Sequence, residues 1–432
     1  MLANARAATV VEAMIAKAGG LLSPRVAVSA QFNAAPAATT AVAPSAAIDI
    51  DVVTTRAAFD ALEAEWNDLF ARAGRSIHVF QTFGWCWHWC NHFIGRGDAA
   101  GGTTLYVVTA RRAGRLVLVW PLVLSRTGGF ARLSCLGEPV TQYADAIVDA
   151  TENKSELLDA AWSFIVADSG ADAFYFRRVR ADADIAPLLA AKGADICERL
   201  QAPYLDLGSA PDFVTYEQRY SAKARKNRRR LLRRFEERAP ATLETRSSGA
   251  RARELAELAL LLKRAWLKDR GLVSPALADP RTRAFFSDVA EARSHPAGCR
   301  VTSLETRGES TAIEIAFDCK GRRAVHVIVF SLKYERASPG QLLIERSVRN
   351  CFDSGVGIYD LMAPADAYKL DWADGATEVN DWTVALSAKG RVYTRLYLAR
   401  VRPLLKKAVN ATTRRLRALG SRPAQPQPAD AE

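Results

Sequence analysis

The sequence lacks the long apolar segment that a membrane-spanning helix requires. No run of about 18 uninterrupted apolar residues occurs in the 432-residue chain. The alanine-rich stretch over residues 1–47 is interrupted by Glu12, Lys17 and Gly19-Gly20, so it also lacks the apolar run of a secretory signal. These absences predict a cytoplasmic protein with a flexible, disordered leader over residues 1–47.

The chain is also poor in the residues that hold metals or form covalent intermediates. It has seven cysteines and five histidines, and the tightest group is Cys86, His88, Cys90 and His92. On a helix the two cysteines would share one face and the two histidines another, and no second Cys/His pair lies nearby to complete a tetrahedral site. We therefore expect no metal, and reduced, buried thiols. No Ser/His/Asp or Cys/His set has a spacing that indicates a covalent intermediate.

The overall composition is that of a soluble globular protein with an excess of positive charge. Hydrophobic residues make up 49% and charged residues 25%, and the formal net charge is +12. The length suffices for two domains with cores of their own. The charge favours an anionic partner, such as a CoA thioester, a charged tRNA or an anionic surface.

Two segments concentrate this charge. Residues 221–238 contain nine basic and two acidic residues around a narrow apolar stripe of Leu231, Leu232 and Phe235. The pattern predicts a helix that contacts a nucleic-acid backbone or another anionic polymer, or else a solvated helix with extended basic side chains. Residues 400–417 contain seven basic and no acidic residues. They suit a helix lying on an anionic membrane, which would make the protein peripheral to the inner membrane, or a plain solvated terminus.

The most regular pattern lies in residues 311–372. Two apolar strands, 311–317 and 324–330, flank a turn, and a helix is predicted to begin at Pro339. Gly355 ends that helix, and a short strand follows over 358–362. The first N–H groups of such a helix have no internal partner and form a site for an anion.

This region resembles the second domain of the CelD-type (cellulose-biosynthesis-protein) acyltransferases, a branch of the GNAT superfamily. A more distant similarity is to the Fem-type peptidyl transferases, which duplicate the same fold and keep a lysine in the place of Lys369. The resemblance covers residues 50–400 and implies an α/β (α+β) fold of tandem GNAT-like domains, each a mixed sheet flanked by helices. We expect a leader over 1–47, domains over 48–210 and 211–395, and a basic helical tail with a disordered end over 396–432. The residues that carry the resemblance are Glu314-Ile315-Ala316, Tyr334, Ser338-Pro339-Gly340-Gln341-Leu342-Leu343, Tyr359-Asp360, Tyr368-Lys369 and Trp372.

The resemblance implies direct acyl transfer from acyl-CoA, for which a site must hold two substrates, remove a proton and stabilise an oxyanion. Glu314 or Asp360 would accept the proton, with His326 as a second possible base, and Lys369 or Tyr368 would assist the oxyanion or the leaving group. Each has a structural alternative: Asp360 as a turn cap, Glu314 as an arginine partner and His326 as a satisfied strand residue. The donor's phosphates would bind at Ser338, Gly340, Gln341, Leu342 and Leu343, although Pro339 has no N–H to offer there.

Four further residues are predicted to contact the substrate: Trp85, Trp89, Trp266 and Arg264. Trp85 and Trp89 are four apart, so the alternative is one buried helix face. The functional prediction is an acyltransferase, EC 2.3.1 type, that modifies an amine or hydroxyl of a cell-envelope or exopolysaccharide precursor. The alternatives are a Fem-like transferase that uses aminoacyl-tRNA and a non-catalytic subunit of a polysaccharide-synthesis assembly.

Overall fold

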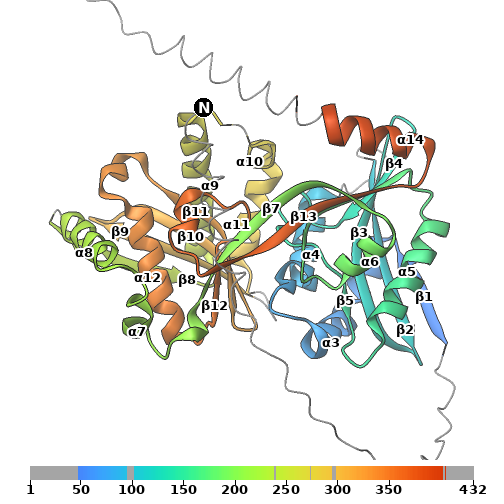
Figure 1. Cartoon of the computed structure of the whole chain (residues 1–432), viewed down its shortest axis with the longest axis horizontal. Helices are drawn as coiled ribbons and strands as arrows, with labels where there is room; N and C mark the ends of the chain where they lie inside the picture. Colours follow the sequence, from blue (N-terminus) through green and yellow to red (C-terminus); the bar gives the residue numbers. More distant parts are fainter. Residues whose placement is uncertain are drawn as a thin grey trace, which may run out of the picture. The chain divides into compact units, whose positions relative to one another are not determined.

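The apolar strands of the sequence pair into one continuous sheet. We analysed a computed structural model, which describes residues 47–94, 102–237, 240–272, 274–293, 298–401 and 404. The described strands form a 13-stranded sheet in the order β1-β2-β3-β4-β6-β13-β7-β12-β11-β10-β9-β8, and β5 pairs with β3 off this path. Helices flank the sheet (Figure 1). The predicted α/β fold with a mixed sheet flanked by helices is confirmed.

The first half of the described chain runs from β1 to β7. A strand and helices precede an antiparallel meander of β2, β3 and β4, after which α5 crosses to β6, which is parallel to β4. The elements are β1 (Ile48–Val53), α2 (Arg56–Ala61), α3 (Glu63–Ala73), η1 (His78–Gln81), α4 (Phe83–Phe93), β2 (Thr103–Arg112), β3 (Arg115–Thr127), β4 (Phe130–Cys135), β5 (Ile147–Val148), α5 (Lys154–Asp168), β6 (Ala173–Arg180), α6 (Ile185–Ala191) and β7 (Asp195–Asp206).

The second half repeats this order after the connecting segments η2, α7 and α8. A strand and helices again precede a meander, here β9, β10 and β11, and α12 crosses to β12, which is parallel to β11. The elements are η2 (Leu207–Ser209), α7 (Phe213–Glu217), α8 (Ala222–Glu236), β8 (Thr242–Arg246), α9 (Ala250–Asp269), α10 (Pro275–Ala278), α11 (Pro280–Glu291), β9 (Gly298–Thr306), β10 (Glu309–Cys319), β11 (Arg322–Phe330), η3 (Leu332–Ala337), α12 (Pro339–Asp353), β12 (Ile358–Asp360), α13 (Ala367–Leu370), β13 (Gly375–Ala385), α14 (Ala388–Val392) and the π-helix η4 (Tyr393–Val401).

The last strand of each half pairs with the other half. β7 ends the first half but lies against β12, and β13 ends the second half but lies against β6. The two strands also pair with each other, and Figure 1 shows them running side by side between the halves. The two predicted sheets are therefore one sheet, joined by exchanged strands.

The packing of the helices explains why both halves share a core. One large apolar cluster joins Trp66 of α3 and Trp85 of α4 to Leu255 of α9 and Phe285 of α11, so it continues from the first half to the second. Separate clusters lie under α5 and α6 in the first half and under α12 in the second. Residues from Ala46 onward form one compact unit.

The local predictions hold best where glycine and proline mark the boundaries. Helix α12 begins at Pro339 as predicted, and the basic segment forms α8. Leu62 caps the end of α2 and directly precedes α3.

The predicted leader lies outside the described residues except for its last position. The predicted basic tail lies outside them beyond Val401, apart from Leu404. Among the described helices, none combines the length and the apolar character needed to cross a membrane.

Candidate functional site

The sheet of the second half opens between β11 and β12. These two strands pair only from Arg322 opposite Ile358 to Ala324 opposite Asp360. β11 continues to Phe330 along β10, whereas the chain after β12 turns to β7, where the Leu361 N–H donates to the Pro203 carbonyl at 2.9 Å. The divergence leaves that side of β11 without a strand partner among the described residues.

A bulge in β11 lies at this divergence. Val327 pairs with Ile315 and Val325 pairs with Ala316, so the residue between them, His326, has no partner on β10. A bulge redirects the side chain of the extra residue and is frequent beside functional sites. His326 was predicted as a possible base, and the bulge explains why it departs from the regular alternation of the strand.

A loop of the first half closes over the same place. The Val140 carbonyl accepts a hydrogen bond from His326 Nε2 at 2.6 Å, and the Tyr143 hydroxyl donates to Asp360 Oδ1 at 2.9 Å. Gly137 permits this loop: its φ is +108°, and a Cβ there would collide with the Thr141 hydroxyl. The site is therefore built from both halves.

Lys369 enters the site from the short helix α13. Its side chain is 8% exposed, and its Nζ donates to the Met362 carbonyl at 2.9 Å. Burial lowers the pKa of Lys369 to about 8, although the nearby Asp366 carboxylate acts to raise it. A buried lysine with a lowered pKa is typical of a functional site. Tyr368, next to it, is half-buried, and burial raises the pKa of its phenol.

A second lysine, which the sequence analysis did not select, also reaches this region. Lys263 of α9 donates from Nζ to the Ile328 carbonyl on β11 at 3.3 Å, and burial lowers its pKa. Its ammonium lies 4.8 Å from the ring centroid of Trp266, which is half-buried. The neighbouring Arg264, which was predicted to bind substrate, is exposed. Lys263 and Arg264 are adjacent in α9, so only one of the two side chains can face the sheet, and in the structure it is Lys263.

The hydrogen bonds of His326 fix its tautomer. A carbonyl oxygen can only accept, so Nε2 carries the hydrogen that points to Val140. Nδ1 then holds the lone pair, and it has no hydrogen-bond partner among the described residues. Burial lowers the pKa of His326 to about 4, so the imidazole is neutral at physiological pH.

Asp360 is fully buried and surrounded by donors. Oδ1 accepts from the Tyr143 hydroxyl and from the Met362 N–H, each at 2.9 Å. Oδ2 accepts from Arg322 Nη1 at 2.8 Å and from Arg180 Nη1 at 3.4 Å. Through these four hydrogen bonds the Asp360 carboxylate joins the two halves of the chain.

Glu314 is also fully buried, but its contacts belong to another part of the molecule. It accepts a hydrogen bond from the Tyr359 hydroxyl, and the Ser347 hydroxyl of α12 also acts on it. Burial raises its pKa, which Arg323 partly opposes. The structure thus places Glu314 in the polar interior under α12, while Asp360, His326 and the loop over residues 137–144 come together.

The N-terminus of α12 offers fewer donors than predicted. Ser338 precedes it in the left-handed region at φ +52°, and its carbonyl accepts from the N–H groups of Gln341 at 3.0 Å and Leu342 at 3.4 Å. Pro339 has no N–H, which leaves Gly340 as the position whose N–H can face a ligand. A Cβ on Gly340 would meet only Phe330, at 3.4 Å. The side chains of Leu342 and Leu343 are buried in the apolar core.

Aromatic and basic residues surround this helix start. The Trp372 indole donates to Gln341 Oε1 at 2.8 Å, and the guanidinium of Arg228 on α8 lies 3.9 Å from the Trp372 ring centroid. It also lies 3.8 Å from the ring of Tyr220. Helix α8 therefore brings its positive charge next to the start of α12.

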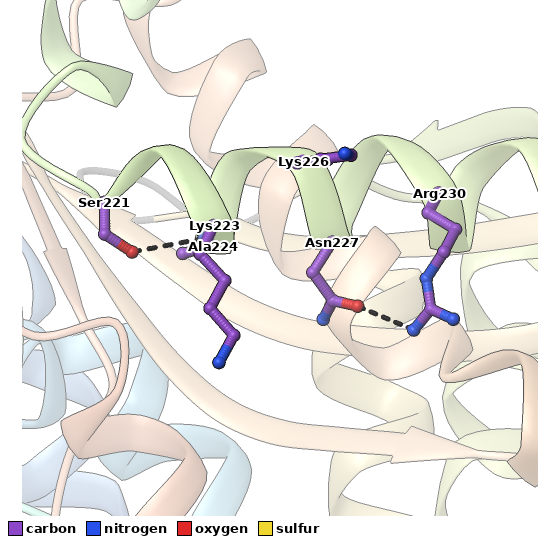
Figure 2. A pocket seen from close by; sticks show the side chains of 6 residues that line it. All are labelled: Ser221, Lys223, Ala224, Lys226, Asn227 and Arg230. Carbon is purple, nitrogen blue, oxygen red and sulfur yellow. Dashed lines mark hydrogen bonds between the residues drawn. The ribbon is translucent and has the colours of Figure 1, made fainter.

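Helix α8 borders an open hollow of about 560 Å³. Figure 2 shows Lys223, Asn227 and Arg230 extending from the same side of the helix, with Asn227 Oδ1 accepting from Arg230 Nη2 at 2.8 Å. The helix itself begins at Ser221, whose hydroxyl accepts from the Ala224 N–H at 3.2 Å. Exposed lysine and arginine side chains on a helix of this kind can contact the phosphates of an extended anion.

The two predicted substrate tryptophans lie in the core. Trp85 and Trp89 are 4% and 3% exposed, and their indoles donate to the Thr141 hydroxyl and the Glu138 carbonyl, each at 2.9 Å. They fix the loop that carries Val140, and the Trp85 ring lies 6.2 Å from the His326 ring. Their placement matches the structural alternative of one buried helix face.

Among the described residues, one group of potential metal ligands lies elsewhere in the first half. His78, Asp145 and Asp184 have ligand atoms within 4.8 Å of one another. Both carboxylates already have cationic partners, because Asp145 binds Arg75 at 3.2 Å and Asp184 binds Lys154 at 2.9 Å. Cys86 and Cys90 are buried, and burial raises the pKa of both thiols.

Comparison with known proteins identifies a domain in the second half. Residues 222–370, from α8 to α13, match the family described as acetyltransferase (GNAT) domain. This segment contains β11, α12 and Lys369. Comparison with curated proteins finds no match.

Several solved structures resemble the chain at low sequence identity. The C-terminal domain of a putative lysylphosphatidylglycerol synthetase from Agrobacterium fabrum is 14% identical, covers 78% of this chain and 96% of that one, and has a TM-score of 0.46. A tandem GNAT protein from the clavulanic acid biosynthesis pathway is 16% identical, covers 78% and 99%, and has a TM-score of 0.44. FemX is 11% identical, covers 72% and 97%, and has a TM-score of 0.48.

Proposed function

We propose that the protein is an acyl-CoA-dependent acyltransferase that acts on an amine or a hydroxyl by direct attack. The observation that carries the proposal is Lys369, a buried lysine with a pKa of about 8 at the divergence of β11 and β12. The match of residues 222–370 to an acetyltransferase domain supports it. A cell-envelope or exopolysaccharide acceptor follows only from the resemblance of the sequence to CelD-type proteins.

The chemistry assigns a role to two side chains. The acceptor nitrogen attacks the thioester carbonyl, an N–C bond forms, and the carbonyl oxygen becomes an oxyanion. Lys369 donates to that oxyanion with a hydrogen that Met362 does not use. As the C–S bond breaks, Lys369 gives a proton to the leaving thiolate, while Nδ1 of His326 accepts the proton that the acceptor nitrogen loses. Exchange with solvent restores both groups.

Asp360 and Glu314 serve this site indirectly. Because Asp360 already accepts four hydrogen bonds, its role is to hold Tyr143 and the arginines in place. Glu314 acts through Tyr359 and α12. Neither carboxylate needs to exchange a proton with substrate.

The donor's phosphates would bind at the start of α12. Two features of this helix start suit an anion. Gly340 leaves room beside its Cα and has an N–H that can donate to the ligand, and the N-terminus of the 15-residue helix α12 carries the positive end of the helix dipole. The fewer backbone donors are offset by Arg228, which lies beside Trp372 and Gln341. Arg336 is exposed at the end of η3, directly before this helix.

Calorimetric titration with acetyl-CoA and with a longer acyl-CoA tests the donor. We expect micromolar binding that is lost in Gly340→Trp, because the new side chain would occupy the space beside Phe330. Gly84→Trp is the matched control, since Gly84 also has open space at its Cβ and lies in α4. Failure of the wild-type protein to bind either thioester would contradict the proposal.

Aminoacyl-tRNA is a second candidate donor, and helix α8 favours it. Eight of the 15 residues of α8 are lysine or arginine, and the hollow beside it is open enough for a phosphodiester backbone. The test is tRNA binding measured at several salt concentrations. Binding that weakens steeply with salt, and is reduced in the double variant Lys223→Gln/Arg230→Gln, would support tRNA; equal binding by that variant would contradict a role for α8.

A further inference from the structure

The last described helices, α14 and η4, expose apolar and basic side chains together. They follow each other directly, so the chain is helical from Ala388 to Val401. Among the described residues nine large apolar side chains are exposed, and three of these belong to this part of the chain: Val392, Leu396 and Leu404. Single exposed apolar residues are normal on a protein surface, whereas a group of them on one short segment indicates a binding surface.

The burial pattern shows that Val392 and Leu396 face away from the rest of the chain. The buried positions of the segment recur every four residues, at Gly390, Thr394 and Leu398. Val392 and Leu396 each lie two positions after a buried residue, which is about half a turn of such a helix. They are 61% and 50% exposed. The two side chains therefore form an apolar ridge on the outer side of the segment.

Contacts on the inner side hold the segment against the first half. The Ser387 hydroxyl donates to Asp172 Oδ1 at 2.5 Å, and a Cβ on Gly390 would collide with the Asp172 carbonyl. The Tyr393 ring lies 4.8 Å from that of Phe130 on β4, and Figure 1 shows α14 next to this strand. The inner side is thus packed, and the outer side is available to a partner.

Exposed arginines flank the apolar ridge. Arg391 and Arg395 are exposed, and each directly precedes one of the two outward-facing apolar residues. Arg400 is exposed at the end of η4. Long basic side chains lay their stems along an apolar surface while their charged heads reach water or another polar layer.

Carboxylates do not balance this positive charge. Residues 382–429 include eleven lysines and arginines and no aspartate or glutamate. Asp172 bonds to the start of α14, but its oxygens already accept from the Ser387 hydroxyl and from the Ala131 N–H at 2.9 Å. Lys389 acts on Asp172, and its Nζ donates to the Gly129 carbonyl at 2.8 Å. The outer side of the segment therefore favours an anionic partner.

We propose that residues 388–401 bind the surface of an anionic lipid bilayer, with Val392 and Leu396 inserted among the headgroups and the arginines on lipid phosphates. A soluble anion would bind the arginines but leave both apolar side chains in water, whereas a bilayer accepts both kinds of side chain. Helices of this kind lie in the plane of the interface and bind through buried apolar area and through attraction to anionic lipids. The proposal goes beyond acyl transfer and does not depend on it.

Co-sedimentation of the full-length protein with lipid vesicles tests the proposal. One set of vesicles is phosphatidylcholine alone, and the other is an equal mixture of phosphatidylcholine and phosphatidylglycerol. We expect the wild type to bind the mixed vesicles at least about tenfold more tightly, because several basic residues act at the surface together. High salt should weaken that binding. No binding to the mixed vesicles, or equal affinity for both kinds, would overturn the proposal.

The apolar ridge is tested by Val392→Gln/Leu396→Gln, which should bind the mixed vesicles at least about tenfold more weakly. Val214→Gln/Leu261→Gln is the matched control, because it removes a valine and a leucine of similar exposure, 63% and 47%, from α7 and α9. The control should bind like the wild type. All four residues are exposed, so neither variant should change the melting temperature. Wild-type affinity in Val392→Gln/Leu396→Gln would place the contact outside this segment and overturn the proposal.

Two further measurements test the charge and the alternative partner. Arg391→Gln/Arg395→Gln should bind the mixed vesicles more weakly, and Lys223→Gln/Arg230→Gln on α8 should not. The reverse result would move the membrane contact to α8 and overturn the proposal. Sedimentation velocity without lipid should give the same mass for the wild type and Val392→Gln/Leu396→Gln. A wild-type dimer that dissociates in this variant would assign the surface to a second copy of the chain and would also overturn the proposal.

Discussion

Replacing Asp360 with asparagine should destabilise the fold. The substitution keeps the volume but replaces an acceptor with an amide that donates, opposite Arg322 and Arg180. Breaking a buried ion pair costs about 3–5 kcal/mol when a charge is left without its partner. Arg180 retains Asp182 at 2.8 Å, so most of the loss falls on Arg322, and we expect about 3 kcal/mol.

Urea denaturation followed by tryptophan fluorescence measures this loss as a change in the unfolding free energy. Asp182→Asn is the matched control, because that carboxylate is 51% exposed and should cost less than about 1 kcal/mol. If Asp360→Asn unfolded with the wild-type free energy but lost acyl transfer, Asp360 would act in the reaction and the structural assignment would be wrong.

Three further predictions follow from groups with shifted pKa values or special backbone geometry. Lys369→Ala should reduce the rate of transfer by about 100-fold or more, as expected for the loss of one oxyanion donor. In the wild type, kcat should fall as pH rises through about 8, because the Lys369 ammonium loses its proton there. Lys369→Arg should move that fall in kcat to higher pH. Glu314 has a raised pKa, so the unfolded chain releases its proton first and stability declines as pH rises above the ordinary glutamate range. Glu314→Gln should flatten that decline and raise the melting temperature at pH 7. Gly137→Ala should distort the loop over 137–144 and weaken transfer in a protein that remains folded. The amides of Val140 and Thr141, which donate to the Gly137 carbonyl, should then exchange faster, and unchanged exchange would contradict the prediction.

Much of the fold could be predicted because local signals mark its elements. Pro339 and Gly355 bound α12, and alternation of apolar residues marks β10 and β11. The exchange of β7 and β13 could not be predicted, because it depends on which of several similar strands pair over a long sequence separation. Periodicity determines which face of a strand is buried but not its neighbour.

The site was predictable to a lesser extent, since its residues meet only in the folded chain. Lys369 and His326 were selected for their chemistry, and they lie in the same site. Val140 and Tyr143, which bind His326 and Asp360, lie much earlier in the sequence, and no local pattern marked them. Their loop depends on the left-handed backbone of Gly137 and on tertiary contacts that sequence patterns do not record.

The strand exchange explains why residues so far apart in sequence can form one site. Each half ends in a strand that the other half binds, so neither half has a complete sheet without its partner. This pairing places β6 and β12 on either side of two shared strands, and the loop before β5 can then reach both Asp360 and His326. A duplicated fold with separate sheets would leave each site dependent on its own loops alone. The exchanged arrangement instead lets one half supply Lys369 and the start of α12 while the other supplies the loop that fixes His326.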